Sequence, residues 1–233
     1  MPLRAPPTGG RWGVTALLAT GMCVSPPALP ALTDQEIAAL CRDADGTAHC
    51  GKLIEHAVLD RHPGVASRVG GVLRINLARG REIDLADGGK ASPGGLDYSL
   101  WDVLDAPGYA VVWAQEADAS RYLLVDREDG HIYKLPGEPM LAPDRSYFAC
   151  ADFCARGCVN ELSLWKVEPH GLRRSATYRP AERWVDAGVR WQNRDTLLLD
   201  VQVESDPAHE RGGGPRRELE VKLNDSRWSA DAP

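Results

Sequence analysis

From Val65 onward, apolar and polar residues alternate with a period of two, in short runs separated by turns rich in glycine and aspartate. A period of two places successive side chains on opposite faces of a strand, and glycine turns join neighbouring strands. The runs cover 72–77, 82–85, 109–113, 121–125, 132–135, 146–152, 161–167, 172 onward, 189–191, 196–203 and 218–223. We therefore expect residues 65–233 to form a mainly β domain, built as a meander.

The segment 32–64 has helical spacing instead. Thr33 and Glu36 stand three residues apart, as in a capping box, and begin the first predicted helix. Apolar residues then recur along one face of a second predicted helix, at Cys50, Leu53, Ile54, Ala57 and Val58. Pro63 ends this pattern, because the residue before a proline avoids helical geometry. The sequence thus predicts a helical hairpin that packs with the β domain as one unit.

The first 31 residues resemble neither part. Arg4 and Arg11 precede an apolar stretch at 14–24, and small residues follow up to Ala31. This order is typical of a secretory signal peptide, and the stretch is shorter than the roughly 20 residues that a membrane-spanning helix needs. We expect cleavage after Ala31, a periplasmic or secreted protein, and no transmembrane segment in the mature chain.

The overall charge is acidic. The chain has 27 basic and 33 acidic residues, a net charge of −6. Removing Arg4 and Arg11 with the signal peptide leaves 25 against 33, a net charge of −8. Nucleic-acid binding needs clustered positive charge, so nucleic acid is not an expected partner.

Five cysteines follow the predicted signal peptide, and in an oxidising compartment they are expected to pair. Cys41 and Cys50 flank the connection between the helices and are predicted to pair. Cys150, Cys154 and Cys158 cannot share one zinc ion from a single helix, since eight residues rise about 12 Å and the sulfurs around one zinc lie within about 4 Å. We predict a Cys154–Cys158 disulfide and a buried Cys150 thiol. A Cys150–Cys158 bridge is the alternative.

Residues 141–149 (LAPDRSYFA), followed by 162–167 (LSLWKV) and a turn at Gly171, resemble a WD40-like propeller repeat of the TolB type. Ala142 and Arg145 stand where that repeat usually has serine and glycine, and residues 189–203 offer a degraded second copy. Gly130 and Gly171 close equivalent turns at about the 40–45 residue period of propeller blades. The resemblance implies a propeller-like or partial-propeller meander, and it implies no activity.

No catalytic motif is found in the sequence. His49, His56 and His62 lack the i, i+4 spacing of a helical metal-ligand pair, and neither a Gly-x-Ser-x-Gly motif nor a phosphate-binding glycine loop occurs. We therefore assign no catalytic residue, no cofactor and no metal.

Two regions are candidates for a binding surface. One is an aromatic cluster whose alternative is burial in the core, and the other is the polar, glycine-rich loop 204–217, whose alternative is a mobile hairpin tip. The candidate residues are Trp101, Tyr109, Trp113, Asp206, His209 and Arg211. The sequence thus favours a non-catalytic, inhibitor-like binding protein of the cell envelope with a protein partner. The alternative is an envelope hydrolase whose acids or histidines converge only in three dimensions.

Overall fold

The computed structural model describes residues 31–88, 96–116, 119–155, 157–204, 214–224 and 227–231. These residues contain two helices, α1 (Asp34–Cys41) and α2 (Thr47–Arg61), and one short 3-10 helix, Ala78–Gly80. Their strands are β1 (Ala66–Val69), β2 (Val72–Asn76), β3 (Glu82–Ala86), β4 (Leu96–Leu104), β5 (Tyr109–Glu116), β6 (Ala119–Asp126), β7 (Ile132–Leu135), β8 (Pro139–Leu141), β9 (Tyr147–Asp152), β10 (Glu161–Glu168), β11 (Gly171–Tyr178), β12 (Trp184–Trp191), β13 (Thr196–Val203), β14 (Arg216–Asn224) and β15 (Arg227–Asp231).

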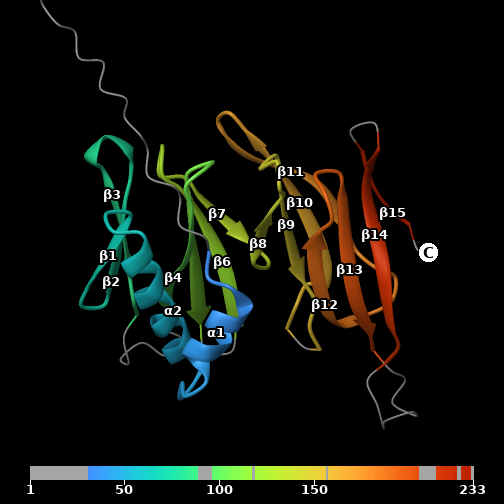
Figure 1. Ribbon diagram of the computed structural model, residues 1–233, viewed down its shortest axis with the longest axis horizontal. Helices are drawn as coiled ribbons and strands as arrows, with labels where there is room; N and C mark the ends of the chain where they lie inside the picture. Colours follow the sequence, from blue (N-terminus) through green and yellow to red (C-terminus); the bar gives the residue numbers. More distant parts are fainter. Residues whose placement is uncertain are drawn as a thin grey trace, which may run out of the picture.

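Within the described residues the strands form four antiparallel sheets, each with its strands in chain order. The first sheet contains β1–β3, the second β4–β7, the third β8–β11 and the fourth β12–β15. They stand in a row, with the first sheet at one end and the fourth at the other (Figure 1). The predicted mainly β fold with an N-terminal helical hairpin is confirmed. No helix of the described residues is long and apolar enough to cross a membrane.

The middle sheets are apolar on both faces, which explains the unbroken apolar run of β5. Ala110 and Val112 pack with the helices and the first sheet, in a core that includes Ile54. Tyr109 and Val111 point to the opposite face and pack against the third sheet. Side chains that alternate between two cores therefore hold the four sheets together. Each Å² of apolar surface removed from water contributes about 25 cal/mol of stabilising free energy.

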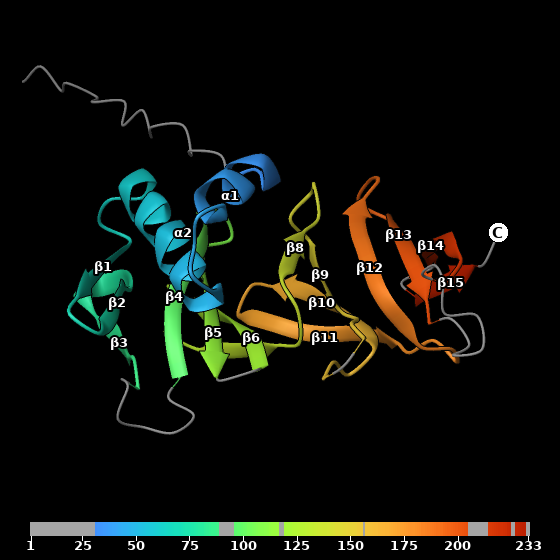
Figure 2. The ribbon, with the colours of Figure 1, turned by 90° about the horizontal axis from the view of Figure 1, so that it is seen from below.

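Helix α2 lies next to both the first sheet and β4 (Figure 2). Gly51 permits this close approach, because a Cβ added at this position would lie 2.6 Å from the ring of Trp113. The capping box also forms: Glu36 N donates to Thr33 Oγ1, and Thr33 N donates to a carboxylate oxygen of Glu36. The predicted capping box at the start of the first helix is confirmed, with Thr33 as N-cap and α1 beginning at Asp34.

A buried ion cluster joins α2 to the sheets. The Glu55 carboxylate accepts from Arg68 at 2.6 and 2.8 Å and from the backbone N–H of Leu100 at 3.0 Å. Arg68 also donates to Asp87 at 2.9 Å, and Lys52 donates to the same carboxylate. Since each buried charge has a partner, the cluster avoids the penalty of an isolated buried ion.

The fourth sheet closes the row with one apolar and one charged face. Leu197 and Leu199 of β13 pack against Leu162 in the third sheet. The opposite face carries exposed ion pairs, Arg190 with Glu218 at 2.8 Å and Arg216 with Asp186 and Asp200 at 3.1 Å. This solvated face ends the stack, because a further sheet would have to desolvate its charges.

Four strands were not predicted as separate strands: β1, β4, β8 and β15. In β4 the register shifts between Leu100 and Asp102, so a bulge interrupts the alternation that marks a strand. Strand β8 has only three residues and begins with Pro139, which is tolerated because β8 lies at a sheet edge.

Candidate functional site

A groove of about 700 Å³ lies between the second and third sheets. The start of β6, the β7–β8 connection and the loop between β9 and β10 contribute its lining. The described residues that matter most to its chemistry are Arg121, Tyr122, Glu138, Asp152, Phe153 and Val159. A second cavity, between the third and fourth sheets, measures only about 70 Å³. The groove lies within the size range of ligand-binding pockets, so we take it as the candidate site.

Disulfide bonds join the two predicted cysteine pairs. In the loop between β9 and β10, Cys154 bonds to Cys158 with an S–S distance of 1.99 Å. Cys41 bonds to Cys50 at 1.94 Å, next to the core beneath the helices. Cys150 is a free, buried thiol, as predicted. It faces the second sheet, and burial raises its pKa.

The loop between β9 and β10 forms one wall of the groove and is held at several points. The Asp152 carboxylate accepts from Val159 N at 2.7 Å, and its backbone carbonyl accepts from Asn160 N at 2.9 Å. Arg183 donates to the carbonyl of Ala155 at 2.8 Å. Val159 is nevertheless 58% exposed, and among the described residues it shares this exposure of a large apolar side chain with Val69, at 67%. The loop thus presents an apolar side chain from a constrained backbone.

Glu138 contributes a carboxylate to the groove. It accepts a 2.7 Å hydrogen bond from Trp101 Nε1. Although Glu138 is an exposed residue, crowding by neighbouring atoms raises the pKa of its carboxyl group. The Trp101 hydrogen bond opposes this shift, and the nearby charge of Asp102 adds to it. The cost of partly desolvating the negative charge is the physical cause.

Asp152 contributes a second carboxylate whose pKa is raised. Burial is again the main cause, the hydrogen bond from Val159 N opposes it, and the charge of Glu161 adds to it. Arg121 brings positive charge to the lining, but it donates to Glu116 at 2.7 Å. If Glu116 is counted with the described charged residues of the lining, the groove therefore has three carboxylates and one guanidinium.

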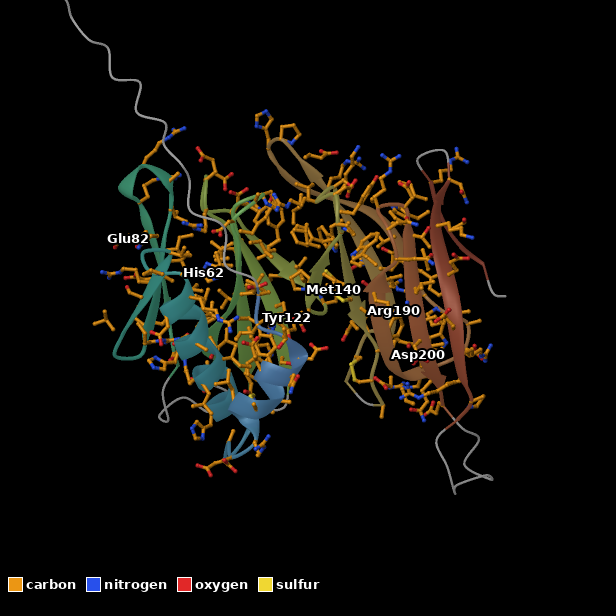
Figure 3. All side chains as sticks on the ribbon, viewed as in Figure 1. His62, Glu82, Tyr122, Met140, Arg190 and Asp200 are labelled. Atoms are coloured by element: carbon orange, nitrogen blue, oxygen red, sulfur yellow. A yellow bond between two sulfur atoms is a disulfide. The ribbon has the colours of Figure 1, made fainter. Side chains whose placement is uncertain are left out.

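An aromatic chain leads from the helices to the groove. The rings of Trp113 and Trp101 lie 5.8 Å apart, and Trp101 meets Tyr122 edge to face at the same distance. Tyr122 lies near the middle of the row (Figure 3). Burial raises the pKa of Tyr122. Because Trp113 rests against Gly51, helix packing helps to set the groove's aromatic wall.

Gly137 sets the path of the β7–β8 connection along the groove. A Cβ added there would clash with the carbonyl oxygen of Ala151 in β9. The connection therefore runs directly against the third sheet. This close approach positions the adjacent Glu138 at the groove.

The structure keeps Trp101 and Trp113 in ring contact but places the predicted aromatic residues in different surroundings. Trp101 adjoins the groove through Glu138, whereas Trp113 lies in the contact between helix and sheet. Tyr109 is only 3% exposed and packs 5.9 Å from Phe148, so it belongs to the core between the sheets and not to a surface. Its alternation with Ala110 directs it into that core.

The other predicted surface residues, Asp206, His209 and Arg211, lie outside the described residues, as does the predicted signal peptide apart from Ala31. The sequence did not single out Glu138, Asp152 or Val159 for the site. The paired cysteines next to Asp152 were the available clue to this loop. In the described part of the chain, no three His, Cys, Asp or Glu residues form a group that could hold a metal ion.

Comparison with protein-family models, with curated proteins and with solved structures found no match for this chain.

Proposed function

We propose that this chain is an exported, non-catalytic binding protein of the cell envelope or extracellular space, which receives a protein partner in the groove. One observation carries the proposal: the groove wall is a disulfide-closed loop that exposes Val159 beside aromatic and carboxylate side chains. A constrained loop loses little conformational entropy on binding, and an exposed apolar anchor gains from burial.

Two further features support the proposal. Disulfides form and persist in oxidising compartments, in agreement with the predicted signal peptide. The three four-stranded meanders agree with the resemblance to propeller blades of the TolB type, and rigid β frames often carry binding loops. An inhibitor-like role follows if the partner is an enzyme whose active site the loop enters.

Photocrosslinking tests the proposal. A photoreactive phenylalanine analogue replaces Val159 in one variant and Val69, the matched exposed valine of β1, in another. After irradiation with envelope extract of the source cells, mass spectrometry identifies any adduct. We expect one discrete adduct from position 159 and none from position 69. No adduct from position 159, or the same adducts from both, would contradict the proposal.

A hydrolase is the second candidate, favoured by one observation. Glu138 and Asp152 line one groove, and both have a raised pKa, as a general acid requires. Turnover of glycoside or peptide substrates that is abolished by Glu138→Gln and retained by Glu82→Gln would establish this activity. Absence of turnover across both substrate classes would leave binding as the groove's role.

A further inference from the structure

The groove's lining indicates what kind of segment it receives. Its described carboxylates, Glu138 and Asp152, each accept one hydrogen bond from the protein, from Trp101 and Val159 respectively. An ionised carboxylate has about four acceptor positions, so each keeps capacity for another donor. The described cation in the lining, Arg121, is already paired with Glu116. The groove thus offers unsatisfied negative charge.

Aromatic side chains accompany this charge. Tyr122 and Phe153 line the same groove, and both are partly exposed. The face of an aromatic ring attracts ammonium and guanidinium groups, and the alkyl stems of lysine and arginine pack well on apolar surface. Carboxylates beside aromatic rings therefore complement both the charged group and the alkyl stem of a lysine or arginine side chain.

The size of the groove favours a peptide segment over a small cation as its ligand. A volume of about 700 Å³ exceeds what one basic side chain fills, whereas a segment of several residues would occupy it. The exposed Val159 on the loop wall adds an apolar contact for a neighbouring residue of that segment.

We propose that the groove binds an extended lysine- or arginine-bearing segment of a partner protein, with a basic side chain at Glu138 and Asp152 and against the ring of Tyr122. This inference rests on the proposed binding function and adds the chemistry of the partner. The shifts of the two carboxyl pKa values agree with it, because a bound cation would supply the countercharge that both groups lack.

Fluorescence anisotropy with defined peptides tests this inference. A labelled peptide of about eight residues that alternates lysine with alanine is compared with one in which glutamate replaces lysine. Glu138→Gln and Asp152→Asn each remove one charge, and asparagine retains an acceptor for Val159 N. Glu82→Gln is the control, because Glu82 is an exposed acid at the far end of the row (Figure 3).

We expect the basic peptide to bind the wild type. Its affinity should be about tenfold lower for each groove variant, and for Glu82→Gln it should stay within about twofold of the wild-type value. Equal binding of the acidic peptide, equal affinity in all variants, or no binding of the basic peptide would overturn the inference. A specific adduct at position 159 without basic-peptide binding would refute the partner chemistry alone. Failure of both experiments would refute the binding function as well.

Discussion

The helical cap, formed by α1 and α2, and the loop between β9 and β10 each combine a disulfide with a partnered carboxylate. In the cap, Cys41–Cys50 lies against the main core, and the Glu55 side chain is only 4% exposed. In the loop, Cys154–Cys158 lies beside the groove, and Val159 remains 58% exposed. A disulfide and a partnered carboxylate thus occur together once in the interior and once at the surface.

The difference between the buried cap and the exposed loop indicates what a disulfide contributes in each of them. The cap is already held by apolar packing and buried ion pairs, so its disulfide adds to the stability of the whole fold. The loop has fewer such contacts, so its disulfide determines the shape of the groove wall. Variants that weaken the cap should therefore lower global stability, and variants of the loop should chiefly lower binding.

The largest expected loss of stability is at Glu55. Glu55→Ala leaves Arg68 with the Asp87 carboxylate and the Tyr98 carbonyl, and leaves the N–H of Leu100 without its carboxylate, at a cost of about 3 kcal/mol in the free energy of unfolding. Urea denaturation measures this change. The control is Glu218→Ala, whose exposed pair with Arg190 should contribute about 0–1 kcal/mol. Equal losses in the two variants would refute the interior role of the cluster.

Removing the cap disulfide should cost slightly less. Cys41→Ser with Cys50→Ser opens a loop of about ten residues, worth about 2.7 kcal/mol in the chain-entropy model. Thermal and urea unfolding should show the loss, while partner crosslinking from position 159 persists under native conditions. Loss of crosslinking while the fold remains intact would contradict the division between cap and loop.

The loop disulfide should matter less for global stability. Cys154→Ser with Cys158→Ser opens a loop of about five residues, for which the same model gives about 2 kcal/mol. Amide hydrogen exchange should accelerate more at Val159 and Asn160, whose N–H groups bond to Asp152, than in α2, where exchange reports only the global loss. Equal acceleration in the loop and in α2 would show that the loop supports the whole fold.

The smallest expected effect tests how closely the cap fits the sheet. Gly51→Ala places a methyl group 2.6 Å from the Trp113 ring. The overpacking cost exceeds the gain in helix propensity, which gives a net loss of about 1 kcal/mol. Gly188→Ala is the control, since its nearest neighbour, the Cβ of Asp200, would lie 3.9 Å away. A stabilised Gly51→Ala variant would refute the close packing.

Local patterns predicted the parts of the fold that depend on neighbours in sequence. Thr33 and Glu36 form the capping box, and cysteine spacing predicted Cys154–Cys158. Strand β4 was missed because its bulge interrupts the alternation after Leu100. A register shift depends on pairing with β5, and no single strand's sequence records it.

The groove could not be predicted because it depends on contacts between distant segments. Glu138 and Trp101 are 37 residues apart and meet only after two sheets pack together. Burial of Tyr109 likewise depends on Phe148 in the third sheet. The sequence predicted the disulfide in the loop, but the opposite wall of the groove could be identified only from the three-dimensional structure.

Photocrosslinking from position 159 in the two cysteine-pair variants tests the central claim most directly, that the disulfide-closed loop forms a partner site. Circular dichroism first establishes that both variants are folded at the temperature used. We predict that adduct yield falls about tenfold without Cys154–Cys158 and stays within about twofold of the wild type without Cys41–Cys50. Equal yields in the two variants, or a greater loss without Cys41–Cys50, would contradict the account.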